Sequence, residues 1–288
     1  MKLFKINKIN EQIFSMKVIS FLSVLTVFLN FFSCKAQPVA TSSVENKPLD
    51  TSTHRINYTD ISNFTMDYLM GKFDPSDHPD FILIPAQYRD EEIRYIRKDV
   101  LKSFISMYEA AAKEGIYFKI KSATRNFENQ KRIWENKWTG KTLLEDKINA
   151  AIDIKDDLSR AKKILEYSSM PGTSRHHWGT DMDLNAFENE WFESGEGLKI
   201  YNWLSAHGHK YGFCQPYSKM GSDRHAGYFE EKWHWTYMPV SEKLTELAGK
   251  ELNNEMISGF LGAETAMKID VVKNYVLSIS PACKNTRN

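Results

Sequence analysis

The fold assignment starts from ten residues, SRHHWGTDMD at positions 174–183, together with a second short stretch, EEKWH, at positions 230–234. Histidine and acidic residues concentrate in these two windows. A catalytic zinc ion typically takes three protein ligands from histidine and carboxylate side chains and leaves a fourth position for water. The two windows can supply such a set, although a histidine and a carboxylate seven residues apart are weak evidence on their own.

The first window needs a sharp turn before its histidine and carboxylate can meet. Fully extended, the seven steps from His176 to Asp183 would span about 23 Å, so the segment must fold back. Gly179 lies where such a turn requires a permissive backbone. Beyond it, the alternation of a strand directs Asp181 and Asp183 to one face. Two carboxylates are therefore expected to face the same region.

The surrounding sequence predicts helices interspersed with short strands. Apolar residues recur at spacings of three and four after Asp90 and mark one face of a helix that ends near Gly115; they are Ile93, Ile96, Val100, Phe104 and Met107. Further helices are expected over residues 128–137, 156–167, 198–207 and most of 241–277, and strands over 117–121, 180–187 and 232–237. Neither a regular strand–helix alternation nor a glycine-rich phosphate loop is present, which favours an α+β domain.

Composition excludes one class of partner. The chain has 288 residues, an apolar share of 42% and a formal charge of +1, which is ordinary for a globular protein with one catalytic domain and extensions. No long run of like charge suggests an electrostatic surface for nucleic acid. A small, nearly neutral or zwitterionic substrate fits this charge better.

The N-terminus resembles an export signal. Several lysines precede the apolar run 18–32, which is short and close to the start for a membrane span. The run ends in Phe31-Phe32-Ser33-Cys34, and a small residue directly before a cysteine resembles a bacterial lipobox, despite the aromatic pair. We expect lipidation of Cys34, with an ordinary cleaved signal peptide as the alternative. In either case the chain is expected to be exported to the periplasm.

The sequence predicts that the chain has four parts. Residues 1–34 are the expected signal peptide with lipobox, and 35–55 a flexible tether rich in small and polar residues. Residues 56–240 form the expected catalytic domain, and 241–288 a mainly helical C-terminal extension. An exported compartment permits a disulfide between Cys214 and Cys283, but two separate buried thiols are equally compatible with the sequence.

Three motifs, in this order along residues 116–237, are similar to one family. They are SATRNFxxQ from Ser122 to Gln130, SxHxxGxxxD from Ser174 to Asp183, and ExWH from Glu231 to His234. Together they resemble the signature of the D-alanyl-D-alanine carboxypeptidases and dipeptidases associated with vancomycin resistance. These zinc peptidases share their fold with hedgehog signalling domains, so the resemblance implies a small antiparallel sheet with flanking helices.

Position by position, the resemblance implies one zinc ion per chain, bound by His176, Asp183 and His234. It also implies that Glu231 is the catalytic base and that Arg125 is a substrate-binding cation. Arg125 is permanently charged and suits either the substrate's terminal carboxylate or the carbonyl oxygen as charge develops there. The resemblance further implies that Gln130 and Ser174 contribute to substrate binding.

Two residues qualify this assignment. Asp181 replaces the small residue usual in the family, and it could be a neighbouring partner of a ligand, an extra metal contact or a solvated side chain. Glu231 lies three residues before His234, and in a regular strand such residues point to opposite faces. We therefore expect Glu231 in irregular backbone just before the strand. His177 is expected to be a polar loop residue, or to replace His176 if the loop register differs.

The predicted activity is removal of the terminal D-alanine from peptidoglycan stem peptides through a metal-activated water. The alternatives are a D,D-dipeptidase, a peptidoglycan endopeptidase of the same fold, or a zinc-stabilised module that binds wall peptides without cleaving them. A lipid anchor in the inner or outer membrane would favour polymeric wall or its precursors as the substrate.

Overall fold

The computed structural model describes residues 64–284, so the expected signal peptide, Cys34 and the tether lie outside the described part of the chain. The helices and strands are α1 (Met66–Leu69), β1 (Phe81–Leu83), β2 (Tyr95–Arg97), α2 (Lys98–Lys113), β3 (Ile120–Ser122), α3 (Phe127–Trp138), α4 (Ala150–Asp153), α5 (Asp157–Ile164), β4 (Asp181–Leu184), α6 (Gly195–His207), β5 (Phe213–Cys214), β6 (His234–Tyr237), α7 (Met238–Glu251) and α8 (Ala266–Ile269). Within residues 64–284, no helix is long and apolar enough to cross a membrane.

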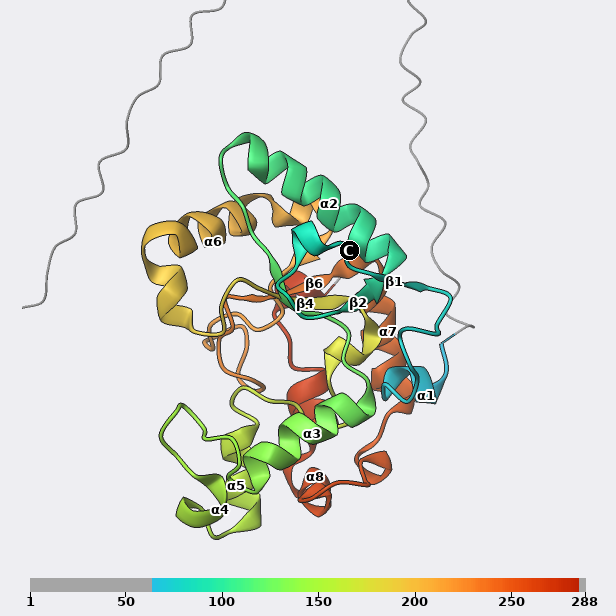
Figure 1. Ribbon diagram of the computed structural model, residues 1–288. Helices are drawn as coiled ribbons and strands as arrows, with labels where there is room; N and C mark the ends of the chain where they lie inside the picture. The colour runs from blue at the N-terminus through green and yellow to red at the C-terminus, as the bar shows by residue number, and fades with distance from the viewer. Residues whose placement is uncertain (1–63, 285–288) are drawn as a thin grey trace, which may run out of the picture. The chain divides into compact units, whose positions relative to one another are not determined.

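The centre of the fold is a four-stranded antiparallel sheet in the order β3-β4-β6-β5, and β1 and β2 form a separate antiparallel pair. Figure 1 shows α2 and α6 on one side of the paired strands β4 and β6, with α3, α4, α5 and α8 gathered on the other side. The expected α+β class, a small antiparallel sheet with flanking helices, is confirmed.

Helix α2 covers the core with the apolar face that the sequence predicted, but it begins later than expected. Val100, Phe104 and Met107 are fully buried. Ile96 instead lies in β2, where it pairs with Ile82, and Ile93 is 70% exposed. The prediction was wrong for these two residues because the chain is extended where it pairs with β1, and the helical spacing there is coincidental.

The strands are shorter than predicted. β4 ends at Leu184 because Asn185 adopts a left-handed backbone with φ 62°, a conformation that asparagine tolerates better than most residues. The Asn185 side chain accepts a hydrogen bond from the backbone N–H of Lys119 at 3.2 Å. This contact fastens the end of β4 to the segment that leads into β3.

The C-terminal segment packs into the core. The boundary drawn at residue 240 falls inside α7, which begins at Met238, and the later residues Val272, Val276 and Ile279 are buried. A disulfide joins Cys214 to Cys283 across a sequence separation of 69 residues. Of the two possibilities that the sequence left open, the structure has the disulfide.

Replacing Cys283 with Ser is expected to lower the free energy of unfolding by about 2–4 kcal/mol, because the unfolded chain regains the freedom that the cross-link removes. Urea unfolding of the wild type and the variant would measure the difference. A reducing agent should bring the wild type to the stability of Cys283→Ser and leave the variant unchanged. Equal stability of the oxidised wild type and the variant would contradict the expectation.

Candidate metal centre

His176 lies on a 3-10 turn, Arg175–Trp178, which is closed by Gly179 in a left-handed conformation with φ 71°. A Cβ atom added at Gly179 would lie 2.4 Å from the Phe81 ring, so only glycine fits this reversal. The Nδ1 atom of His176 lies 2.7 Å from the backbone oxygen of Ala123. The turn predicted between His176 and Asp183 is therefore confirmed, and the ring is held with Nε2 directed away from that carbonyl.

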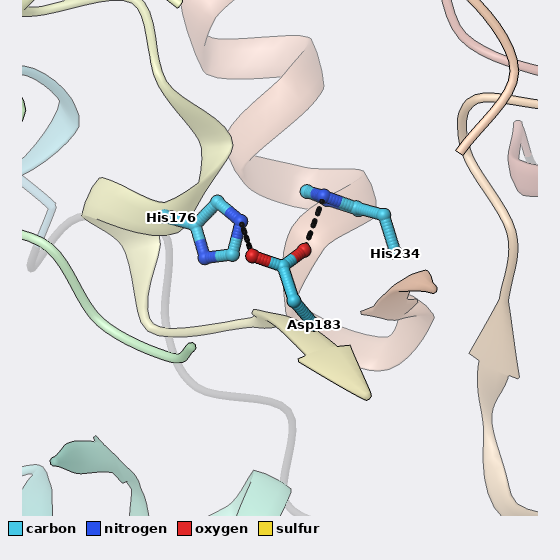
Figure 2. Close-up of side chains that lie close together, drawn as sticks. All are labelled: His176, Asp183 and His234. Atoms are coloured by element: carbon cyan, nitrogen blue, oxygen red, sulfur yellow. Dashed lines mark ion pairs between the residues drawn. The ribbon is translucent and has the colours of Figure 1, made fainter. Parts of the chain in front are cut away.

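The side chains of His176, Asp183 and His234 converge on one buried point (Figure 2). One Asp183 oxygen lies 3.3 Å from Nε2 of His176, and the other lies 3.1 Å from Nδ1 of His234. One ligand atom from each residue lies within 4.8 Å of the others. Asp183 and His234 are directly opposite each other in β4 and β6, so strand pairing brings two of the three groups together.

Buried polar atoms in this region have no hydrogen-bond partner among the described residues, although such atoms are satisfied in most proteins. Those that belong to the three motif segments are Thr124 Oγ1, Arg125 Nε, Gln130 Oε1, Ser174 Oγ, His176 Nε2 and Asp183 Oδ1. Two of them are a histidine nitrogen and a carboxylate oxygen within the cluster. A divalent cation that accepts nitrogen and oxygen ligands fits this donor set.

Glu231 lies in irregular backbone before β6, as predicted, because β6 begins only at His234. Its backbone N–H donates to the oxygen of Tyr217 at 3.0 Å. This orientation brings the Glu231 carboxylate within 3.2 Å of Nδ1 of His234. Glu231 therefore lies beside the cluster, in a position to reach a molecule bound there.

The carboxylates of the site have pKa values shifted in opposite directions. Burial raises the pKa of Glu231, against the lowering effect of its hydrogen bond with His234. Burial alone would also raise the pKa of Asp183, but His176 and His234 hold it well below its usual value. Such a divergence commonly separates a group that exchanges a proton from one that stays charged. Within the buried site, Asp183 is therefore held ionised, whereas burial favours the protonated form of Glu231.

Asp181 lies on the far side of the His234 ring from the cluster. Its carboxylate is 2.8 Å from Nε2 of His234, whereas Asp183 faces Nδ1. Asp181 is fully buried. Of the three roles that the sequence left open, the geometry supports a partner of His234 and excludes a solvated side chain.

His177 is buried and has both ring nitrogens engaged, which agrees with the expectation that it is not a ligand. Its Nε2 accepts the backbone N–H of Gly172 at 3.0 Å, and its Nδ1 is 2.6 Å from the oxygen of Arg125. Burial lowers the pKa of His177 to about 3. His177 stays neutral and braces the loop that precedes α3, and neither ring nitrogen is left for a metal.

Of the expected substrate-binding residues, Arg125 and Ser174 adjoin the turn that carries His176. Among the described residues, no carboxylate lies within ion-pair distance of Arg125, whose backbone N–H donates to the oxygen of His176 at 3.2 Å. Gln130 donates one hydrogen bond from Nε2 to the oxygen of Ser169 at 2.7 Å, and its buried Oε1 has no partner among the described residues. Ser174 is buried with its Oγ unpartnered. Their roles in substrate binding stay predictions.

Sequence reasoning missed Lys137. Its Nζ lies 2.5 Å from the Ser168 hydroxyl, and burial, followed by the charge of Arg125, lowers its pKa, while the charge of Glu231 opposes this. Lys137 is therefore a second cation near the site. Lys137 lies seven residues after Gln130, so both side chains are on one face of α3. This spacing could have identified Lys137 from the sequence.

Comparison with known proteins agrees with the motif analysis. Residues 93–240 match a family model described as VanY: D-alanyl-D-alanine carboxypeptidase. Among curated proteins, the chain is 32% identical over 179 residues to "Putative carboxypeptidase YodJ" of Bacillus subtilis, covering 59% of this chain and 56% of the relative. It is 29% identical over 164 residues to a D-alanyl-D-alanine carboxypeptidase of Enterococcus faecalis, covering 54% and 55%. The chain thus spans about half the length of these relatives.

Solved structures show a weaker likeness. An LD-carboxypeptidase, LdcB, has 22% sequence identity and a TM-score of 0.44, covering 69% of this chain and 81% of that one. VanYB in complex with D-alanine-D-alanine has 23% identity and a TM-score of 0.42, covering 59% and 93%.

The cluster predicts that the chain binds one divalent ion and that His176→Ala weakens this binding. Loss of a ligand should exceed the roughly 10–100-fold loss that follows removal of an outer hydrogen-bond partner. Titration of the metal-stripped protein with zinc, followed by calorimetry, would measure both the affinity and the stoichiometry. The matched control is His225→Ala, which removes an exposed histidine and should leave the affinity unchanged. Equal affinities of the two variants would rule the cluster out as the site.

Proposed function

The chain belongs to the VanY family of D-alanyl-D-alanine carboxypeptidases, and we propose that it is a zinc-dependent peptidase that removes the terminal D-alanine from peptidoglycan stem peptides. The observation that carries this proposal is the placement of Glu231, 3.2 Å from His234, at a buried cluster of three ligand-type side chains. A metal ion bound by these three side chains alone would be compatible with a purely structural role. An adjacent buried carboxylate with a raised pKa gives the site a group suited to move a proton.

His176 through Nε2, Asp183 through its carboxylate and His234 through Nδ1 would hold the ion. Zinc bound there supplies a Lewis acid that acidifies water and polarises a peptide carbonyl. Because Asp183 is held ionised, it offsets part of the charge of the cation. The two histidines contribute neutral donors when they act as ligands.

Glu231 acts as the general base in this proposal, and then as the general acid. Its carboxylate takes the proton of the attacking water and delivers it to the leaving amine, so no covalent intermediate is required. Arg125 offers a planar fork of donors, and its buried Nε has no hydrogen-bond partner among residues 64–284. It suits the terminal carboxylate or the carbonyl oxygen on which charge develops.

The alternative peptidase activities would use the same site residues and differ in the substrate or the product. A D,D-dipeptidase acts on the free dipeptide, and an endopeptidase releases a larger fragment than D-alanine. A module that only binds wall peptides needs no base, so the placement of Glu231 argues against it.

The test is to incubate the purified protein with a pentapeptide that ends in D-Ala-D-Ala and to quantify free D-alanine. We expect release that a chelator stops and zinc restores. Glu231→Gln should lower kcat by about 10²–10⁴-fold, the usual contribution of a general base. Glu230→Gln is the control, because it removes a neighbouring carboxylate outside the cluster and should retain activity. A zinc-loaded wild type that releases no D-alanine would defeat the carboxypeptidase proposal, and a different fragment would identify one of the rivals.

Export and lipid anchoring complete the proposal, supported by the apolar run 18–32 and the following Ser33-Cys34. An anchored enzyme in the periplasm would work beside nascent wall, which suits a polymeric substrate. Mass spectrometry of the mature N-terminus is expected to find a lipid-modified Cys34, and Cys34→Ala should move the protein from the membrane to the soluble fraction. A mature chain that begins with an unmodified residue after Cys34 would rule out the anchor.

A further inference from the structure

Asp181 is not one of the three ligand-type residues, but both of its carboxylate oxygens have hydrogen-bond partners. One of its oxygens lies 2.8 Å from Nε2 of His234 and accepts a hydrogen bond from Nε of Arg175 at 3.2 Å. The other accepts hydrogen bonds from the hydroxyls of Thr180 and Thr236, at 2.7 and 2.6 Å. Four donors thus surround a carboxylate that is fully buried, and the group has little freedom to turn toward the cluster.

This contact fixes the orientation of His234. An ionised carboxylate only accepts hydrogen bonds, so the Nε2 atom of His234 carries a proton and donates it to Asp181. The opposite nitrogen, Nδ1, is then directed at Asp183 and Glu231, at 3.1 and 3.2 Å. Asp181 therefore determines which nitrogen of His234 is available as a ligand.

Arg175 maintains the charge of Asp181 in a buried environment. Its side chain is 1% exposed, and its remaining nitrogens donate to the hydroxyls of Thr245 at 2.7 Å and Thr236 at 3.2 Å. The guanidinium also lies over the Trp178 ring, 4.5 Å from its centroid. A buried carboxylate without such a partner would be costly to keep ionised. Arg175 and Asp181 form an ion pair on the Nε2 side of the His234 ring, away from Asp183.

The other histidine of the cluster is held differently. Nδ1 of His176 faces a neutral backbone carbonyl, that of Ala123, at 2.7 Å, so His176 presents Nε2. The two histidines thus present opposite nitrogens, and only His234 has a charged partner behind it. A carboxylate behind an imidazole raises the basicity of the ligating nitrogen more than a neutral carbonyl does.

We propose that Asp181, held by Arg175, is a positioning residue that orients His234 and strengthens its bond to the metal. This inference rests on the proposed metal site but not on which peptide bond is cut. A histidine backed by a carboxylate and held in one orientation loses less freedom when it binds an ion. The expected signature is therefore a dependence of metal affinity on Asp181.

The test compares the zinc dissociation constants of the wild type, Asp181→Asn and Asp181→Ala by competition with a chelator. Asparagine keeps the side-chain volume and an oxygen that can accept from Nε2 of His234, but it removes the charge. Asp181→Asn should weaken zinc binding about tenfold and Asp181→Ala up to about 100-fold, the range found for outer partners of metal ligands. The visible spectrum of the cobalt-loaded protein should shift in Asp181→Ala, because His234 is no longer held in one orientation.

The matched control is Asp74→Asn, which makes the same substitution at an exposed aspartate whose side chain accepts hydrogen bonds from Ser76. It should leave the zinc affinity within about twofold. Thermal unfolding of the zinc-free proteins shows whether each variant folds, and Asp181→Asn carries the test if Asp181→Ala does not.

Three outcomes overturn the inference. They are folded Asp181→Asn and Asp181→Ala variants that bind zinc as tightly as the wild type, an equal loss of zinc affinity in Asp74→Asn, or a wild type that binds no zinc. A wild type that binds zinc in an Asp181-dependent manner but releases no D-alanine supports the inference and defeats only the carboxypeptidase proposal.

Discussion

The pairing of β4 with β6 is the constraint on which the site depends. Asp183 lies opposite His234 in this antiparallel register, and Asp181 lies opposite Thr236. A shift of one residue would turn every side chain of β4 to the other face of the sheet, and Asp183 would exchange places with the buried core residue Met182. The register of β4 and β6 therefore brings Asp183 and His234 together. His176 and Glu231 lie outside these two strands, in the segments that precede them.

The sequence predicted most of the site because its determinants are local. The reversal at Gly179, the alternation of Asp181 and Asp183, and the irregular backbone at Glu231 all follow from geometry over a few residues. The ends of helices and strands were predicted less well. The start of α2 was misplaced because Ile96 pairs with a strand distant in sequence, and a spacing of three and four residues does not reveal such a partner.

Other features escaped sequence analysis because they depend on tertiary contacts. The partner of Asp181 is on a different strand, and Lys137 reaches the site only because α3 packs against the segment that contains Ser168. The carboxylates Asp181, Asp183 and Glu231 are chemically similar, but each contacts different neighbours in the fold. The sequence identified these three carboxylates as candidate site residues, but only the structure shows which side chains surround each one.

The disulfide has a consequence for the part of the chain that the family model covers. Cys214 belongs to β5, the edge strand next to β6, and its partner Cys283 lies beyond the matched residues 93–240. A protein shortened to the matched segment would therefore have a lone thiol on an edge strand of the sheet. Such a thiol can react with that of a second molecule, and strand edges already tend to pair between chains. The C-terminal segment thus protects this edge against covalent self-association.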